Sequence, residues 1–333
     1  AASSSCSPLC TGAVHASAPR DRRAHGSRTS LTHTMAAPGV EVPGELVAFA
    51  GELADAAGAV ILKYWRKPIE VVSKIDAGRP VAESPVTAAD RGAEEAMRAL
   101  IAARYPAHAV VGEECGATGD PETAEWTWVL DPVDGTKSFI TGKPLFGTLI
   151  ALLRFKEPAL GVVDQCVLRE RWVGANGATT LNGAPARAAR APEVPLGEAM
   201  VYATTPEMFA PGFEARAFAG LRSRVKRTLY GCDCYAYALC ASGFVGLVCE
   251  ADLQPYDYLA LVPVVAGAGG KITDWRGAPL GWGDASGGRV LAAATPKLHA
   301  AALAALAKPP RDDRVLVFAA GAALGALLGA LAA

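Results

Sequence analysis

The sequence predicts an α/β fold, because segments with helical periodicity alternate along the chain with short apolar segments typical of strands. Of the 333 residues, 51% are hydrophobic and 20% are charged, which excludes a disordered or collagen-like chain. A chain of this length predicts roughly two domains. The 32 basic and 33 acidic residues nearly cancel, so the composition disfavours a nucleic-acid-binding protein.

The first half of the chain predicts two helices and a run of strands. Apolar side chains recur at every third or fourth position over residues 45–64 and 87–104, and Tyr105-Pro106 should end the second helix. Residues 67–74 are expected to be extended. Short apolar segments bounded by turn residues predict strands over 109–112, 126–130, 146–154, 161–165 and 171–174.

A Pro- and Ala-rich stretch over residues 187–197 predicts a boundary, after which strands and helices alternate again. Strands are expected over 199–203, 225–229 and 245–249, and helices over 211–221, 234–242 and 257–268. Asp257 would be the N-cap of the last helix, and Pro263 inside it predicts a kink or a later start. The interpretation is an N-terminal domain over 41–190 and a C-terminal domain over 191–310.

The two ends of the chain differ from these domains in composition. Residues 1–40 are rich in Ser and Arg and poor in acids, which predicts an organelle transit peptide, with an ordinary disordered tail as the alternative. Residues 315–333 carry no charge and approach the ~20 residues that cross a bilayer, with glycines at every fourth position. The tail over 311–333 is therefore either a membrane anchor or an Ala- and Gly-rich helix without that role.

The eight cysteines do not indicate a disulfide scaffold in a chain of this length. Cys232 and Cys234 form a lone CxC, which we interpret as small core thiols in a reducing compartment rather than as a metal or redox site.

Acidic residues gather where the predicted strands stop. They are Glu113 and Glu114 in one cluster, Asp131 and Asp134 in a second, and Asp257 in a third. A residue at a strand end stands on rigid backbone and can face a cleft. Clustered carboxylates repel one another, and a bound cation removes that cost. Because oxygen is the donor in every case, the clusters favour Mg²⁺, Mn²⁺ or Ca²⁺ over Zn²⁺.

The turn that contains Asp131 and Asp134 has features suited to phosphate chemistry. Pro132 stiffens it, and Gly135 lets the backbone approach a ligand. The N–H groups of Gly135 and Thr136 could then bind phosphate oxygens beside the metal. The alternative for each acid taken alone is a helix cap, a turn former or a surface charge.

Three segments resemble the signature motifs of the inositol monophosphatase superfamily. They are VVGEE (110–114), WVLDPVDGTKSF (128–139) and YDYLALVPVVAGAGG (256–270), in the expected order, and the resemblance spans about residues 46–308. It implies a layered αβαβα sandwich of the inositol monophosphatase and fructose-bisphosphatase type. It further implies a Mg²⁺-dependent, lithium-sensitive phosphomonoesterase that forms a homodimer.

The resemblance also implies roles for individual residues. The implied metal ligands are Glu113, Asp131, the carbonyl of Val133, Asp134 and Asp257. Thr136 matches a hydroxyl that orients the attacking water, and Asp90 in SPVTAAD matches the acid that supports this threonine. Gly135 and Thr136 match the backbone that holds the phosphate. The implied reaction is in-line attack by metal-activated water without a covalent phosphoenzyme, with Glu113, Thr136 and Asp90 as the catalytic residues.

Residues 231–261 resemble the histidinol-phosphatase branch of the superfamily more closely than the inositol phosphatases. Tyr256 stands where inositol phosphatases commonly have Trp, and Glu250 matches a glutamate that contacts the non-phosphate part of the substrate. Asp233 is an additional acid. Histidinol phosphate carries an ammonium and a protonatable imidazole, which acids at these positions would favour, whereas inositol offers only hydroxyls.

The resulting hypothesis is a Mg²⁺-dependent histidinol-phosphatase of histidine biosynthesis that acts on a small-molecule phosphate ester. The first alternative is the same chemistry on inositol monophosphate or a galactose phosphate. The second is a catalytically silent, metal-binding or membrane-tethered scaffold. The N-terminal segment favours a plastid location, with the mitochondrion or cytoplasm as alternatives, and residues 315–333 would provide any membrane contact.

Overall fold

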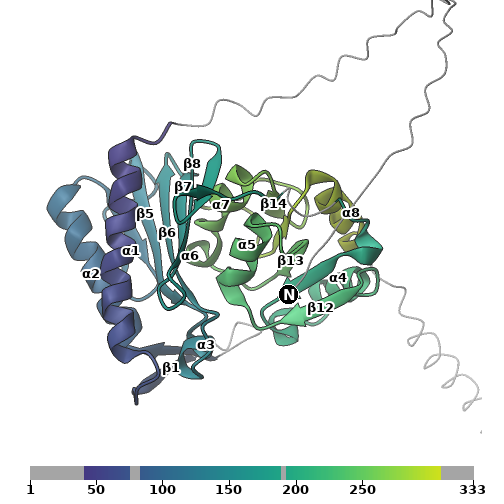
Figure 1. Ribbon diagram of the computed structural model, residues 1–333, viewed down its shortest axis with the longest axis horizontal. Coiled ribbons are helices and arrows are strands. Elements are labelled where there is room, and N and C mark those ends of the chain that lie inside the picture. Colours follow the sequence, from purple (N-terminus) through teal and green to yellow (C-terminus); the bar gives the residue numbers. More distant parts are fainter. Residues whose placement is uncertain (1–40, 76–82, 189–192, 309–333) are drawn as a thin grey trace, which may run out of the picture. The chain divides into compact units, whose positions relative to one another are not determined.

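The structure is a computed structural model that describes residues 41–75, 83–188 and 193–308 (Figure 1). The expected transit segment over 1–40 and the apolar tail over 311–333 lie outside the described residues. Among the residues described, no helix has the length and apolar character that a membrane span requires.

The described strands form two large sheets and one two-stranded ribbon. The eight-stranded sheet has the order β10 (Ala184–Pro185), β9 (Ala178–Leu181), β8 (Glu170–Ala175), β7 (Glu157–Gln165), β6 (Gly147–Arg154), β5 (Trp126–Asp134), β3 (Ala109–Gly112) and β4 (Gly116–Thr118). The five-stranded sheet has the order β12 (Arg227–Tyr230), β11 (Met200–Ala203), β13 (Leu247–Glu250), β15 (Val290–Ala293) and β14 (Lys271–Asp274). The ribbon pairs β1 (Val71–Ile75) with β2 (Glu83–Thr87) in antiparallel register.

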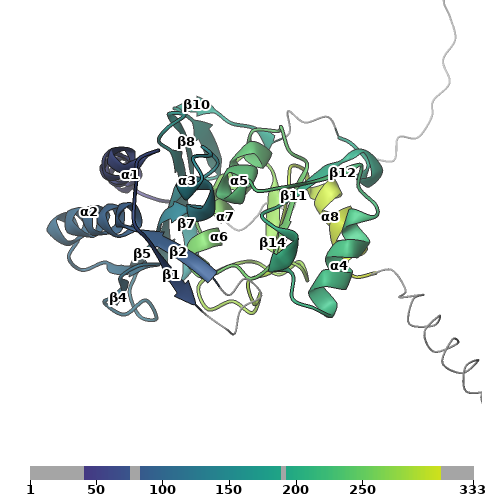
Figure 2. The same ribbon diagram turned by 90° about the horizontal axis from the view of Figure 1, so that it is seen from below.

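Helices cover both large sheets and complete five layers (Figures 1 and 2). The first layer holds α1 (Gly44–Tyr64) and α2 (Ala88–Arg104), the middle layer holds α5 (Asp233–Ala241), α6 (Pro255–Tyr258) and α7 (Leu261–Gly267), and the last holds α4 (Phe213–Arg222) and α8 (Pro296–Leu306). The short helix α3 (Thr136–Ile140) follows β5. The predicted layered αβαβα sandwich is confirmed.

Three buried apolar clusters hold the layers together, and β5 shows how strand geometry divides them. Trp128 and Leu130 belong to the cluster under α1 and α2, whereas Val129 between them belongs to the cluster around α5 and α7. Successive side chains of a strand point to opposite faces, so β5 contributes to both layers. The third cluster lies between the five-stranded sheet and the pair α4 and α8, and includes Phe218 and Leu291.

The predicted elements agree with the structure in type, with two informative differences. Strand β5 runs four residues past the predicted end, because Asp131 and Asp134 still pair with β6 across an irregularity in register. The helix predicted over 257–268 is two helices. Pro255 occupies the first turn of α6, where proline is favoured, so Gln254 rather than Asp257 is the N-cap. Pro263 lies in the first turn of α7, in agreement with the later start predicted from it.

Sequence reasoning missed the short strands β4, β9 and β10, the hairpin partners β14 and β15, and the helix α8. The expected extended segment over 67–74 is a strand only from Val71 onward. The proposed division into domains over 41–190 and 191–310 stays a prediction.

Candidate active site

A cavity of about 520 Å³ opens where β3, β5, α5, β13 and α6 converge. Nine of the ten residues predicted for the site line it: Glu113, Asp131, Val133, Asp134, Gly135, Thr136, Asp233, Glu250 and Asp257. The tenth, Asp90, reaches the site through a hydrogen bond to Thr136. The fold therefore brings together positions that are more than 140 residues apart in the sequence.

The turn after β5 is held in one conformation by its own hydrogen bonds. Asp131 Oδ1 accepts the N–H of Val133 at 3.0 Å, and the hydroxyl of Thr148 donates to the carbonyl of Pro132 at 2.8 Å. Gly135 has φ of 86° and would place a Cβ only 2.9 Å from the carboxylate carbon of Asp233. Only glycine fits both the left-handed backbone and this close approach.

The first turn of α2 supports the threonine of that turn. Thr87 is the N-cap of α2, and its N–H and hydroxyl donate to Asp90 Oδ2 at 2.8 and 2.5 Å. The hydroxyl of Thr136 has Asp90 Oδ1 at 3.3 Å and the carbonyl of Val133 at 3.0 Å as acceptors. Burial raises the pKa of Asp90, against the hydrogen bonds from Thr87 that lower it. The predicted contact between Asp90 and Thr136 is present.

Three aspartates form the centre of the site. Asp131, Asp134 and Asp257 each present one carboxylate oxygen, and these oxygens lie within 4.8 Å of one another. Burial, followed by the charges of Glu113, Asp134 and Asp257, raises the pKa of Asp131 well above its usual value. Burial and the charges of Asp233 and Asp257 do the same to the pKa of Asp134. Carboxylates forced together in this way fit a hard divalent cation, which would relieve their repulsion.

Glu113 lies outside this group of three, whereas Asp257 belongs to it and is held by a helix cap. Glu113 lines the same cavity and acts on the pKa of Asp131, but it is not one of the three mutually close acids. Asp257 is fixed by the capping box of α6, in which its Oδ2 accepts the N–H of Gln254 at 2.7 Å. That role differs from the predicted N-cap, yet it still anchors the side chain to the helix start.

The first residues of α5 contact both Asp134 and the residues that follow β5. The N–H of Cys234 donates to Asp134 Oδ2 at 2.6 Å. Its neighbour Asp233 has φ of 46°, and its carboxylate accepts the hydroxyls of Ser138 at 3.0 Å and Thr204 at 3.4 Å. Burial raises the pKa of Asp233, and the hydrogen bond from Ser138 and the charge of Lys143 lower it. Asp233 therefore lies directly beside the turn at Gly135.

Glu250 is deeper in the cavity wall, at the end of β13. It is 3% exposed and accepts the hydroxyl of Tyr237 at 3.0 Å. Burial raises the pKa of Glu250 to about 7, so near neutral pH its carboxyl can either accept or donate a hydrogen bond.

Sequence reasoning did not identify several residues of this cavity. Lys137 and Lys143 bring positive charge toward Asp233, and Thr204 and Tyr237 orient the acids. Lys137 sits inside the recognised motif and could have been singled out from it. Thr204 directly follows β11, far from the motifs in the sequence, and nothing in the local pattern links it to the site.

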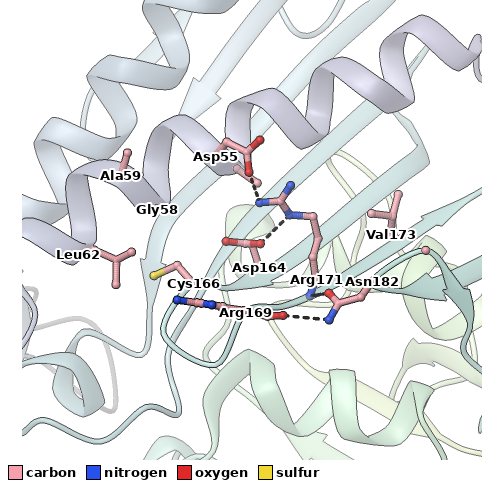
Figure 3. A pocket seen from close by; sticks show the side chains of 12 residues that line it. Asp55, Gly58, Ala59, Leu62, Asp164, Cys166, Arg169, Arg171, Val173 and Asn182 are labelled. Carbon is pink, nitrogen blue, oxygen red and sulfur yellow. Dashed lines mark hydrogen bonds and ion pairs between the residues drawn. The ribbon is translucent and has the colours of Figure 1, made fainter.

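A second cavity, of about 650 Å³, lies between α1 and the strands β7 and β8 (Figure 3). Arg171 crosses it and bonds Asp164 Oδ1 at 2.6 Å, Asp55 Oδ1 at 2.7 Å and the carbonyl of Gly51 at 3.1 Å. Asn182 completes the network by accepting the N–H of Arg171. These acids are ion-paired within the chain, and the network ties α1 to the eight-stranded sheet.

Comparisons with known proteins agree with this geometry. Residues 43–310 match the inositol monophosphatase family. The chain is 52% identical over 260 residues to the Arabidopsis thaliana protein "Bifunctional phosphatase IMPL2, chloroplastic", covering 76% of this chain and 72% of that one. It is 35% identical over 232 residues to a histidinol-phosphatase of Chlorobaculum parvum, covering 68% of this chain and 84% of that one.

A solved inositol monophosphatase from Zymomonas mobilis aligns with a TM-score of 0.68 at 37% identity, over 80% of this chain and 98% of that one. The family match and the fold thus make the chain a phosphatase, and its three close aspartates form a group that could hold a metal ion. The chain belongs to the inositol monophosphatase family, and its substrate is a small-molecule phosphate ester.

Proposed function

We propose that this phosphatase hydrolyses L-histidinol phosphate to L-histidinol and phosphate with Mg²⁺ held by Glu113, Asp131, Asp134, Asp257 and the carbonyl of Val133. The observation that carries the choice of substrate is the acidic wall of the cavity. Asp233 and Glu250 line the same cavity as the turn at Gly135, and the carboxylate of Asp233 lies against that turn.

The chemistry of this wall fits a cationic alcohol better than a polyol. A carboxylate hydrogen-bonded to an ammonium forms a charge-assisted bond, which is about twice as strong as a neutral one. A negative charge on Asp233 is unfavourable for a phosphate ester whose alcohol part is uncharged, whereas an ammonium on the alcohol part offsets it. Glu250, with a pKa near 7, can pair with an imidazole in either protonation state.

The residues of the chain suggest how hydrolysis proceeds. Mg²⁺, when bound, supplies Lewis-acid polarisation of the phosphate and lowers the pKa of water. The N–H groups at Gly135 and Thr136 orient the phosphate. Thr136 has one hydroxyl hydrogen, and when it donates this to Asp90 its lone pairs can accept a hydrogen bond from the attacking water. Asp90 is itself fixed by Thr87, so the threonine is oriented before substrate arrives.

The relatives support the same choice. Proteins named histidinol-phosphatase from Chlorobaculum parvum, Mycobacterium tuberculosis and Streptomyces coelicolor are 35%, 36% and 32% identical to the chain. The word "bifunctional" in the name of the Arabidopsis relative supports activity on a second ester as well. An inositol-1-monophosphatase of Synechocystis is 30% identical.

The deciding experiment measures kcat/KM for histidinol phosphate, inositol 1-phosphate and galactose 1-phosphate, each with and without Mg²⁺. We expect histidinol phosphate to be preferred by at least ~10-fold, because one charge-assisted hydrogen bond contributes about that factor in binding. A preference for inositol 1-phosphate would overturn the proposal. Absence of Mg²⁺-stimulated phosphate release from every ester would favour the scaffold alternative.

A variant of the acidic wall tests the same point independently. Asp233→Asn keeps the size of the side chain and removes its charge. We expect kcat/KM to fall by about 10- to 100-fold for histidinol phosphate, since a hydrogen bond to a charged group contributes about 1.5–3 kcal/mol. The value for inositol 1-phosphate should change little, which separates substrate recognition from damage to the site.

We also propose a plastid location directed by residues 1–40. The Ser- and Arg-rich composition of this segment and the word "chloroplastic" in the name of the Arabidopsis relative support it. A fluorescent protein that carries residues 1–40 should enter chloroplasts of plant cells, and retention in the cytoplasm would argue against this location.

A further inference from the structure

We infer that Glu94, together with Arg98, is a positioning residue of the metal site that sets the place of Glu113. This inference rests on the proposed metal site but assigns a residue outside it. Glu94 lies in the middle of α2, does not line the cavity and is completely buried. A buried carboxylate is costly unless hydrogen bonds satisfy it, so its partners indicate its role.

The partners of Glu94 are the backbone groups that follow Glu113. Its Oε2 accepts the N–H of Glu114 at 2.8 Å, and its Oε1 accepts the N–H of Cys115 at 3.1 Å. The residue before Glu113 is also in contact with it, because a Cβ on Gly112 would lie 2.0 Å from Glu94 Oε1. Glu94 therefore holds the chain on both sides of Glu113.

A further backbone contact of this turn comes from the sheet. The N–H of Glu113 donates to the carbonyl of Leu130 at 3.1 Å, immediately before Asp131. The position of Glu113 relative to Asp131 is therefore set by β5 on one side and by α2 on the other.

Arg98 completes the arrangement one turn further along α2. Its Nε donates to Glu94 Oε1 at 2.7 Å, and its guanidinium also bonds the carbonyl of Gly116 and, at 3.1 Å, the hydroxyl of Thr118. Glu94 and Arg98 thus form an ion pair whose charges offset each other. The pair acts on Glu113 through geometry rather than by adding charge to the cavity.

The same face of α2 supports both halves of the site. Asp90 and Glu94 are four residues apart, so they lie one above the other on the helix. Asp90 contacts Thr136, and Glu94 contacts the turn after Glu113. One rigid helix therefore determines the spacing between the water-orienting hydroxyl and the glutamate. Because Mg²⁺ requires nearly ideal ligand positions, a shift of this turn would weaken binding.

The test is Glu94→Gln, which keeps the shape of the side chain but replaces one acceptor oxygen by a donor that faces N–H groups. The matched control is Glu95→Gln, the same change at an exposed position on the same helix. Binding of Mn²⁺ is measured by electron paramagnetic resonance, and the Mg²⁺ concentration for half-maximal activity by phosphate release. We expect both constants to rise by about 10- to 100-fold in Glu94→Gln, the usual effect of losing a group that orients a ligand.

Two further readouts and the control variant distinguish positioning from general damage. At saturating Mg²⁺, kcat and the KM for the ester should return to within about threefold of wild type, and Glu95→Gln should match wild type throughout. Wild-type Mn²⁺ affinity in folded Glu94→Gln would overturn the inference. Absence of Mn²⁺ binding in the wild-type protein would instead contradict the proposed metal site.

If Glu94→Gln does not fold, Arg98→Lys carries the test. Lysine keeps the positive charge but cannot reproduce the guanidinium bonds to Gly116 and Thr118 together with the bond to Glu94. We expect weaker Mn²⁺ binding in this variant as well, and unchanged affinity would overturn the inference.

Discussion

Two groups of acids in this protein border cavities of similar size but have opposite electrostatic arrangements. In the candidate active site, the charges that act on Asp131 are those of other carboxylates, and its pKa is raised by burial and by their repulsion. Beside α1, the guanidinium of Arg171 bonds Asp164 and Asp55 directly. Burial still raises the pKa of Asp164, but the charge of Arg171 opposes that effect.

This difference distinguishes a structural acid cluster from a metal-binding one. Around Arg171 the cation is part of the chain, so the buried Asp164 is paired once the protein folds and the cluster contributes to stability. Around Asp131, Asp134 and Asp257 the repulsion persists in the folded chain, and the proposed divalent cation would offset it. Three predictions test this contrast, from the largest expected effect to the smallest.

The largest effect is expected from Asp134→Asn in the active-site group. The variant retains an oxygen that can accept the N–H of Cys234, so the fold should persist. The substitution weakens binding of the proposed metal, which would contribute several kcal/mol to catalysis. We therefore expect the rate to fall by at least ~10³-fold. Phosphate release at saturating Mg²⁺ measures this loss. A decrease of less than tenfold would show that Asp134 is not essential to the metal site.

The second prediction concerns Arg171→Met, which leaves two acids without their cation. Since the side chain of Asp164 is only 6% exposed, we expect the free energy of unfolding to fall by about 2–3 kcal/mol, slightly below the usual cost of breaking a fully buried pair. Urea denaturation measures the change, and activity at saturating Mg²⁺ should stay within about twofold of wild type.

Two controls locate the source of that destabilisation. Asp55→Asn removes the partner that is 74% exposed and should cost less than ~0.5 kcal/mol. Combining Asp164→Asn with Arg171→Met removes the unpaired buried charge and should recover part of the loss. Equal destabilisation by Asp55→Asn and Arg171→Met would contradict the assigned importance of Asp164.

The smallest effect is a pH dependence of the chelator-treated protein. The pKa values of Asp131 and Asp134 are raised in the fold, so above pH 3.8 the native state binds more protons than the unfolded chain. Their stabilising contribution is complete below that pH and is lost as pH rises through the raised values. We therefore expect the free energy of unfolding in chelator to fall toward pH 8.

Asp131→Asn should reduce this decline in the free energy of unfolding. In chelator at pH 8 the variant should be more stable than wild type by about 1 kcal/mol, which corresponds to a pKa shift of less than one unit. Addition of Mg²⁺ should stabilise the wild type and not the variant. Thermal unfolding at pH 5 and pH 8, with and without Mg²⁺, gives the comparison. A wild type that is more stable than Asp131→Asn in chelator would contradict the repulsion argument.

Much of the site could be predicted because its residues occur in compact motifs. Asp131 to Thr136 form one turn, and the local chemistry of Pro132 and Gly135 already indicates that it approaches a ligand. Asp233 and Glu250 were found by resemblance, and their placement in the cavity agrees with the role proposed for them.

Other parts of the site could not be predicted because their function depends on contacts between distant elements. Glu94 is an ordinary polar residue of a helix until α2 packs against the turn after Glu113. Thr204 gains its relevance only because β11 lies beside α5. The start of α6 was also predicted at the wrong residue. Asp257 was expected to be the N-cap, whereas Gln254 caps the helix and Pro255 follows it in the first turn.

By itself, the sequence determined the helix and strand types, the turn geometry after β5 and the identity of the oxygen donors, because periodicity and turn chemistry are local properties. Only the tertiary structure decided which acids lie close to other acids and which are paired with an arginine. Both arrangements depend on how α1, α2 and α5 pack on the sheets. Burial and distance, rather than residue type, separate the carboxylates that suit a metal from those that hold the layers together.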